Sequence, residues 1–468
     1  MFSIRPFLGR GEFMSEEDRP LLQPPEGLGA SEPAVSKNIS RVFFYNFVDG
    51  AAFSIWNAQV LQVLVYNLAG NTAVGWISGA GGAAQVVAAI VAGYTGDRIP
   101  RKIVCRTAAF VGLLSVGASL YATYALSVTL MYFCGVFWGA YMGLSNPSSE
   151  ALFADSIETG KRNTLYNMKW IVQIVCYCVG YVLSLVLFLK IGDNWSNGLL
   201  QVVMYVGLGV HPLSMLILTS LRDEDTLKAR ERIVTVNSKE TTPTDDEQRI
   251  KEAKVQSSSL VKADWVPYFV VIGDFLLALG SGMTLRYIPL FFINEYGVSP
   301  SLLMGVYIII SISTAGAVIV VKNIAERFIG RVAAMIAARV TGTTLLLYLA
   351  LATGPAAGLI PMLAVFVVRN ALMNSTLGTS RGVIMDCCNA ASRAKWSAME
   401  SFSSFTWAGS ATLGGYLSDL HGYRYSFLIT CCFHYAAVLA LIPAYLGTKT
   451  LESVVMAIAA KKMKAEVQ

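Results

Sequence analysis

Twelve long apolar segments alternate with short polar connections along most of this chain. A helix needs roughly 20 apolar residues to cross the hydrocarbon core of a bilayer, and each segment is long enough to do so. The pattern therefore predicts an all-α membrane protein with twelve transmembrane helices. The expected helices cover residues 41–67, 73–95, 103–125, 127–154, 164–190, 199–220, 265–293, 301–325, 331–353, 357–386, 396–418 and 424–447.

Hydrophilic segments divide this apolar pattern into parts. Residues 1–40 are polar, rich in Pro, Gly and Glu, and lack an apolar run that could serve as a signal peptide, so they are expected to form a disordered cytoplasmic tail. Residues 221–264 form the longest polar interior stretch and are expected to link an N-terminal bundle (41–220) to a C-terminal bundle (265–447). Residues 448–468 end in a basic run typical of a tail on a cytoplasmic membrane surface.

Lysine and arginine are distributed unevenly among the connections. The connections after the even-numbered helices contain most of them, whereas those after the odd-numbered helices contain almost none. Because basic loops stay in the cytoplasm, this alternation predicts an even number of spans with both termini cytoplasmic. The residues concerned are Arg98, Arg101, Lys102, Lys161, Arg162, Arg327, Arg331, Arg393 and Lys395.

Composition supports the membrane assignment and excludes several functions. The chain is 54% hydrophobic and 14% charged, whereas soluble proteins carry about 25% charged residues. The net charge of +6 comes from residues dispersed at helix ends, which argues against nucleic-acid binding. The eight cysteines and three histidines show no disulfide, zinc or catalytic spacing, and a Walker-type nucleotide loop is missing. We therefore expect no enzyme activity, no cofactor and no metal.

A repeat of about 230 residues relates the two bundles. Three features recur in the same order, so the chain is expected to contain two pseudo-symmetric halves of six helices. Asp155 and Arg162 recur as Asp386 and Arg393, Asp97 to Arg101 recur as Glu326 to Arg331, and Asp49 recurs as Asp274.

The polar turn after the second helix is the most specific motif. Its pattern, Gly93-x3-Asp97-Arg98-x2-Arg101-Lys102, resembles the signature loop between helices 2 and 3 of the major facilitator superfamily of secondary transporters. Pro100 stands where that family usually has Gly. The resemblance covers residues 41–447 and implies two six-helix bundles that rock about a site near the midplane of the membrane.

The same resemblance implies a cytoplasmic gate. Asp97 would cap the helix that begins near Trp396, because a carboxylate is stabilised at a helix N-terminus, and Arg101 would pair with Asp155. In the second half Glu326 would approach helix 5 and Arg331 would pair with Asp386. Ordinary topogenic charge remains an alternative role. The full set of gate candidates is Gly93, Asp97, Arg98, Arg101, Lys102, Asp155, Arg162, Glu326, Arg327, Arg331, Asp386 and Arg393.

Acidic residues inside the apolar segments are candidates for proton coupling. Asp49 lies about 12 Å into the first helix, on one face with Asn46, Phe53 and Trp56. A buried carboxylate can exchange a proton near neutral pH. Asp49 is therefore the first candidate and Asp274 the second, with a structural salt bridge as the alternative for either.

Two arginines within apolar segments are candidates for substrate binding. Arg286 lies in the non-cytoplasmic half of helix 7, and Arg369 lies near the middle of helix 10. A guanidinium there needs an anion, which is either a protein side chain or a substrate carboxylate or phosphate. The candidates for the substrate cavity are Asn46, Trp56, Trp138, Tyr141, Gln173, Tyr177, Arg286, Arg369, Asn370 and Asn374.

These features predict a monomeric secondary-active transporter of a small organic solute, embedded in membrane lipids. An anionic or zwitterionic solute moving with H⁺ is favoured. A facilitative uniporter of a neutral solute such as a sugar, in which Asp49 and Arg369 pair with each other, is one alternative. A non-transporting sensor or scaffold is the other. Glu17, Leu21 and Leu22 resemble an acidic dileucine sorting signal, which favours an endolysosomal or vacuolar membrane over the plasma membrane.

Overall fold

The computed structural model describes residues 36–96, 98–157, 162–227, 265–387 and 393–467. The first half contains six long helices: α1 (Lys37–Trp56), α2 (Val60–Gly96), α3 (Arg101–Tyr124), α4 (Val128–Asp155), α5 (Arg162–Ile191) and α6 (Asn197–Thr219), followed by the short turn η1 (Asp223–Asp225). The second half contains α9 (Val266–Leu285), α10 (Ile288–Tyr296), α11 (Pro300–Ile324), α12 (Arg331–Leu351), α13 (Leu359–Ser375), α14 (Leu377–Cys387), α15 (Arg393–His421) and α16 (Tyr423–Val467). Short helical turns, η3 (Ala325–Ile329) and η4 (Gly354–Ala357), precede α12 and α13.

Several expected helices are interrupted in the structure. The first is divided between α1 and the start of α2, and α2 then leaves helical geometry at Ala69 and Gly70. Gly70 has φ +78°, a conformation that only glycine adopts readily, so the chain turns there and residues 71–96 form the second span. Likewise α9 and α10 share one expected helix, and α13 and α14 share another.

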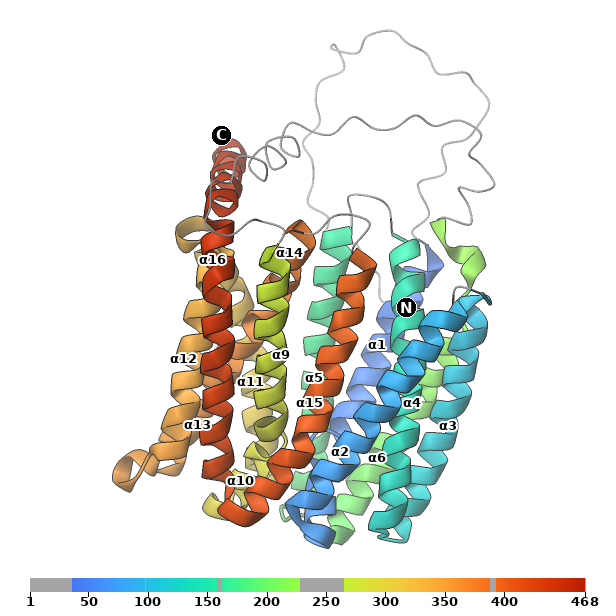
Figure 1. Cartoon of the computed structure of the whole chain (residues 1–468). Helices are drawn as coiled ribbons and strands as arrows, with labels where there is room; N and C mark the ends of the chain where they lie inside the picture. The colour runs from blue at the N-terminus through green and yellow to red at the C-terminus, as the bar shows by residue number, and fades with distance from the viewer. Residues whose placement is uncertain (1–35, 97, 158–161, 228–264, 388–392, 468) are drawn as a thin grey trace. The chain divides into compact units, whose positions relative to one another are not determined.

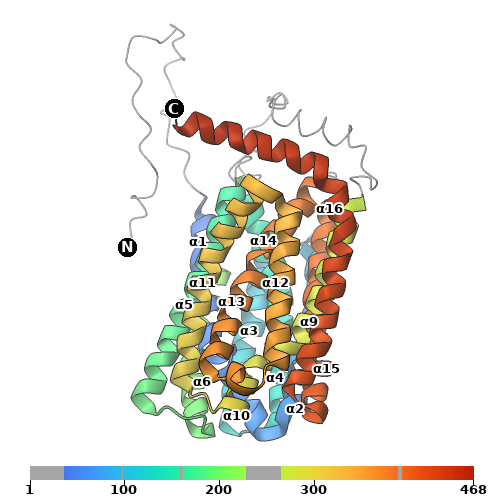
Figure 2. The ribbon, with the colours of Figure 1, turned by 90° about the vertical axis from the view of Figure 1, so that its left-hand side faces the viewer.

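The described helices are consistent with twelve spans. Ten segments are long and apolar enough to cross a membrane. One of these, Lys37–Gly96, includes the turn at Ala69 and Gly70 and therefore contains two spans. The helix α15 adds another 29 residues. At the end of the chain α16 continues to Val467, beyond the expected end at residue 447, and extends past the other helices (Figures 1 and 2).

The two halves meet along two helix pairs, α2 with α15 and α5 with α11. Small residues allow the first pair to approach closely. A Cβ atom added at Gly82 would lie 2.2 Å from the Cβ of Ala408, and one added at Gly75 would lie 2.6 Å from the carbonyl oxygen of Ala411. The glycines of α2 thus set the distance between the halves.

The helix bundle has two ends. The end that holds residues 98–102, 155–157 and 222–227 includes Arg98, Arg101 and Lys102 of the signature turn, and we call it the basic end. The other end, which holds residues 69–72, 192–197, 297–301 and 419–423, is the distal end. Helices run between these two ends in Figure 1.

Candidate functional site

Asp49 is the centre of a hydrogen-bond network inside the first half. Its Oδ1 accepts bonds from the Tyr141 hydroxyl (2.7 Å), the Ser214 hydroxyl (2.9 Å) and Nε2 of His211 (3.1 Å). Tyr45 in turn hydrogen-bonds to the Tyr141 hydroxyl at 3.0 Å. The Asp49 side chain remains 24% exposed, whereas the His211 side chain is fully buried. One carboxylate oxygen is therefore held by three donors while the group keeps access to solvent.

The neighbours of His211 determine its protonation. The indole N–H of Trp56 lies 3.0 Å from Nδ1 of His211. An indole N–H can only donate, so Nδ1 must be the unprotonated nitrogen and Nε2 must carry the proton. His211 is therefore neutral and donates to Asp49. The ring of Trp138 packs on His211 with 4.7 Å between centroids, and its own N–H is bonded to Ser119.

The equivalent acid of the second half has a different environment. Oδ1 of Asp274 is bonded to Nη2 of Arg339 at 2.7 Å, and Oδ2 accepts from the Ser380 hydroxyl. Arg339 is fully buried and also lies 3.4 Å from the Thr376 hydroxyl. Asp274 thus forms an ion pair with a buried arginine, which favours the structural alternative over proton coupling for this residue.

Arg369 and Arg286 differ in exposure but lack acidic partners in the described part of the chain. Arg369 is 1% exposed, and its Nε and Nη2 have no hydrogen-bond partner. Its Nη1 reaches the side-chain oxygen of Asn370 only at 3.5 Å. Arg286 is partly buried, its Nε is unpartnered, and its guanidinium lies 4.9 Å from the ring centroid of Trp407. Both arginines therefore have nitrogens available to bind an anion.

At the basic end, the residues of the signature turn contact their own half. Arg101 pairs with Asp155 at 2.6 Å, the partner expected from the sequence, and Lys102 pairs with Glu224. The carboxylate of Asp223 accepts from the backbone N–H groups of Arg101 (3.2 Å) and Lys102 (2.9 Å). The N-terminus of α3, which Pro100 cannot cap with a side-chain hydrogen bond, is thus capped from the segment that follows α6.

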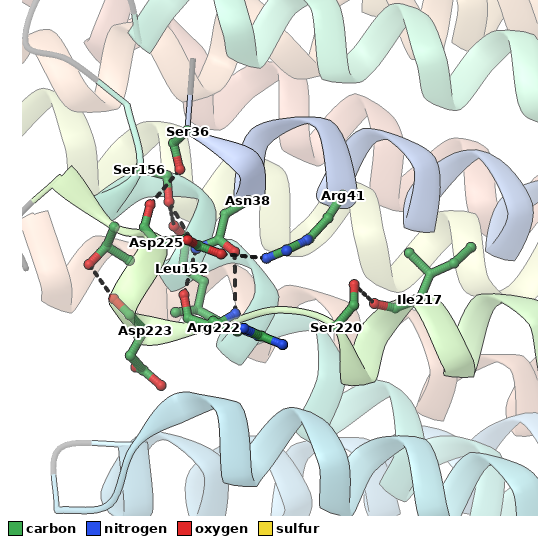
Figure 3. Close-up of polar contacts among 11 residues, drawn as sticks. Ser36, Asn38, Arg41, Leu152, Ser156, Ile217, Ser220, Arg222, Asp223 and Asp225 are labelled. Atoms are coloured by element: carbon green, nitrogen blue, oxygen red, sulfur yellow. Dashed lines mark hydrogen bonds and ion pairs between the residues drawn. The ribbon is translucent and has the colours of Figure 1, made fainter. Parts of the chain in front are cut away.

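The same segment is fastened to α1 (Figure 3). Asn38 donates to the carbonyl of Arg222 at 2.7 Å and accepts from its N–H at 3.3 Å. Arg41 pairs with the side chain of Asp225 at 2.6 Å, and Ser36 donates to the backbone carbonyl of Asp225. The start of the interior polar segment therefore closes over the basic end of the first half.

At the distal end, polar contacts join the two halves. Asp419 of α15 accepts from the backbone N–H groups of Asn71 (3.3 Å) and Thr72 (2.8 Å) and from both of their side chains. Asp193, from the connection between α5 and α6, accepts from the N–H of Ser301 at 2.7 Å and from its hydroxyl. Each half thus supplies one carboxylate that caps the first turn of a helix in the other half.

Two further bonds and a surface pocket surround these caps. The Trp195 indole donates to the carbonyl of Val298 at 2.8 Å, and the Tyr423 hydroxyl lies 3.1 Å from Asn71. A pocket of about 670 Å³ opens here. It is lined by Tyr66, Asn67, Gly70, Asn71, Trp195, Ser196, Asn197 and Asp419.

The other cavity candidates occupy varied positions. Asn46 is partly buried with an unpartnered Nδ2, and Gln173 contacts the Cys176 sulfur at 3.9 Å. Tyr177 and Asn374 are partly buried. Asn370 is bonded to the carbonyl of Phe366 in its own helix. Trp56 and Trp138 are buried and support His211, so Tyr141 is the candidate that contacts Asp49 directly.

The remaining gate candidates divide into two groups. Among the described side chains, Arg98 lies over the Tyr94 ring at 3.9 Å, Glu326 is 3.8 Å from Lys322, and Arg327 and Gly93 are exposed. Arg331 is partly buried. The side chains of Asp97, Arg162, Asp386, Arg393, Trp396, Glu17, Leu21 and Leu22 lie outside those described, so the expected cap by Asp97, the pair of Arg331 with Asp386 and the sorting signal stay predictions.

Several residues of these networks were not expected from the sequence, among them His211, Ser214, Arg339, Asp193 and Asp419. His211 was set aside because the histidines are far apart in the sequence without partner spacing. Arg339 could have been found, since an arginine inside an apolar segment is itself a signal for a buried acidic partner.

Two halves of membrane-spanning helices, with buried polar networks inside them and polar contacts between them, define a multi-pass membrane transporter. The chain belongs to the Major Facilitator Superfamily, because the model of that family matches residues 42–399. None of the curated proteins matches the chain.

Solved structures of transporters share the fold. The nucleoside transporter NupG has a TM-score of 0.60 at 12% identity, covering 87% of this chain and 99% of its own. A bacterial homologue of the iron transporter ferroportin, in an inward-facing state, has a TM-score of 0.62 at 10% identity, covering 87% and 98%. A bacterial homologue of the human lysosomal transporter Spinster, also inward-facing, has 0.59 at 13% identity, covering 90% and 99%. At these identities the likeness is one of fold alone.

Proposed function

We propose that this transporter moves a small anionic or zwitterionic organic solute together with H⁺ by alternating access. The observation that carries the proposal is the environment of Asp49. Three donors fix one carboxylate oxygen, and the side chain keeps solvent access. A proton can therefore bind to the free oxygen without breaking the network, which is what a coupling site requires.

The arginines support an anionic group on the solute. Arg286 and Arg369 lie within the second half with unpartnered guanidinium nitrogens. The uniporter alternative supposes that Asp49 and Arg369 neutralise each other. The donors to Asp49 are instead Tyr141, Ser214 and His211, so this conformation offers that alternative no support.

The contacts between the halves support alternating access. Polar contacts cross from one half to the other at or near the distal end. Three ion pairs at the basic end join residues within the first half. A transporter that rocks about its midplane would break the distal contacts when that end opens and would keep these ion pairs. The dileucine-like Glu17, Leu21 and Leu22 favour an endolysosomal or vacuolar membrane.

Uptake by purified protein in liposomes tests the proposal. A pH jump is applied with pooled metabolites, for wild type and Asp49→Asn in parallel. We expect gradient-driven accumulation by wild type, accumulation at the level of protein-free vesicles for Asp49→Asn, and counterflow by both. Glu295→Gln is the matched control, because Glu295 pairs with Arg424 at the distal end.

Two outcomes would contradict the proposal. Uptake that ignores the proton gradient would make the protein a uniporter and Asp49 a structural residue. The absence of flux for every solute, with binding retained, would favour the sensor or scaffold.

A further inference from the structure

The repeat that relates the two halves places the network of His211 and a second histidine site in equivalent positions. Both histidines lie on the sixth span of their half and contact a residue of the first span. The Trp56 indole is 3.0 Å from His211, and the Ser281 hydroxyl is 3.2 Å from Nε2 of His434. The equivalent pairs are Asp49 and Asp274, Trp56 and Ser281, Trp138 and Arg369, and His211 and His434.

In the first half the space beside His211 is filled by two tryptophan rings, whose polar atoms have hydrogen-bond partners. The rings of Trp56 and Trp138 lie 4.9 Å apart, and that of Trp138 lies 4.7 Å from His211. Both indole N–H groups donate, one to His211 and one to Ser119. The two aromatic rings leave no donor of this site unpaired.

In the second half a serine and an arginine replace the two tryptophans. Ser281 is much smaller than an indole, and Arg369 brings a positive charge. Arg369 is 1% exposed, and its Nε and Nη2 have no hydrogen-bond partner.

The charge of Arg369 is not balanced by any acid that the structure describes in this half. Asp274 is paired with Arg339, and Glu295 is paired with Arg424 at the distal end. An unpaired charge in a protein interior costs several kcal/mol, so a buried guanidinium calls for a counter-ion. Because the protein supplies none among these residues, the counter-ion is expected to be a ligand.

The free edge of Arg369 indicates the chemistry of that ligand. Nε and Nη2 lie on the same edge of the guanidinium and donate in parallel, while Nη1, on the other side, faces Asn370. A carboxylate accepts two parallel bonds from such an edge. A halide ion offers a single centre and matches this geometry less well.

We propose that the second half binds a carboxylate group at the free edge of Arg369. This inference deepens the proposed function, because the carboxylate would belong to the transported solute and the solute would be an organic acid. A small inorganic anion is the competing source of negative charge at the same position.

Thermal unfolding of the purified full-length protein tests the site without a gradient or uptake. The probes are acetate and chloride, each titrated at constant ionic strength against a bulky sulfonate buffer anion. We expect acetate to raise the Tm of wild type saturably. Arg369→Gln should abolish this response, and Arg424→Gln should retain it. Without acetate, Arg369→Gln should unfold at the wild-type temperature or above, because it removes an unbalanced charge.

Arg369→Lys provides a second variant that keeps the charge but loses the parallel donors, and we expect it to weaken the acetate response at least tenfold in apparent affinity. Three results would overturn the assignment: a chloride response that exceeds the acetate response, an acetate response unchanged in Arg369→Gln, or strong destabilisation of that variant without acetate. Loss of acetate binding while Asp49-dependent uptake persists would refute this site alone. Intact acetate binding without any uptake would refute the proposed function alone.

Discussion

Asp49 and His211 show how single side chains control chemistry inside the first half. Asp49 accepts three bonds through one oxygen, and His211 supplies one of them because Trp56 occupies its other nitrogen. The other titratable groups around Asp49 are Tyr45, Tyr141, Cys176 and Tyr177. His211 is thus a positioning residue, and the proton that moves is expected on Asp49.

Trp56→Phe should lower the rate of coupled uptake. The substitution keeps an aromatic ring but removes the indole N–H that bonds to Nδ1 of His211, so the ring loses the contact that directs Nε2 toward Asp49. Trp138→Phe is the control, because its indole is bonded to Ser119 and touches neither nitrogen of His211. Uptake at the wild-type rate in Trp56→Phe would show that the position of His211 does not depend on Trp56.

The pKa of Asp193 predicts how its contact with Ser301 at the distal end depends on pH. Burial raises the pKa of Asp193, but the hydrogen bonds from the Ser301 side chain and backbone outweigh it and hold the pKa below its ordinary value of 3.8. A lowered pKa means that the contact contributes fully above pH 3.8 and is lost as the pH falls through the lowered value. Distances between spin labels across the distal end should therefore stay constant from pH 8 to about pH 5. Spin-label distances that increase between pH 8 and pH 5 in wild type, but not in Asp193→Asn, would contradict this expectation.

At the scale of elements, two helix caps at the distal end are supplied across the boundary between the halves. Asp419 caps the helix that starts at Asn71, and Asp193 caps α11 through Ser301. The repeat relates the two caps, since α2 corresponds to α11 and the end of α5 to the end of α15. A carboxylate at a helix N-terminus satisfies free N–H groups and interacts favourably with the helix dipole.

Removing either cap should shift the protein toward opening at the distal end. Loss of a capping side chain costs about 1 kcal/mol, so Asp419→Ala and Asp193→Ala should each change the ratio of states about fivefold. In the double variant, the change in the ratio of states should be roughly the product of the two single-variant changes, because the two caps share no residue. Spin labels on the exposed Tyr124 and Ile360 positions would report the distances. Glu295→Ala, which breaks a pair within one half, should leave the distances unchanged.

At the scale of the whole molecule, polar contacts at the distal end join the two halves. The distal caps link α2 to α15 and the start of α11 to the connection after α5. At the basic end, Asp223 and Asp225 instead hold α3 and α1 to the segment after α6, within the first half. Alternating access requires the distal contacts to break while those within the half remain.

Cross-linking distinguishes these two kinds of contact. Asp193→Cys combined with Ser301→Cys should form a disulfide between the halves that stops transport, and reduction should restore it. Asn38→Cys with Ser156→Cys is the control. Nδ2 of Asn38 lies 3.3 Å from Oγ of Ser156, and both residues belong to the first half, so this disulfide should not stop transport. Transport that continues through the oxidised 193–301 pair would rule out the rocking motion.

Much of the fold could be predicted from local patterns in the sequence. Apolar segments of the length of a bilayer, basic residues at alternate connections and the recurrence of Asp155 as Asp386 indicated a helical membrane protein with two related halves. The family match confirms the resemblance drawn from the turn after the second helix. These predictions succeeded because bilayer thickness and the cost of moving charge through lipid act on each segment separately.

The site was predictable only in part. Asp49, Arg286 and Arg369 stood out because charge inside an apolar segment is costly wherever the segment lies. Their partners did not stand out: His211 is 162 residues from Asp49 along the chain, and no sequence spacing connects them. The break at Asn57 was also missed, since it occurs within a continuous apolar run.

The sequence by itself thus determined the spans, the duplication and the presence of buried charge. Tertiary structure decided which charges are paired, as for Asp274 with Arg339, and which are left open, as for Arg369. It also decided that Asp193 and Asp419 cap helices of the opposite half. The physical reason is that lipid solvation depends on local composition, whereas a hydrogen bond depends on the relative position of helices that only packing brings together.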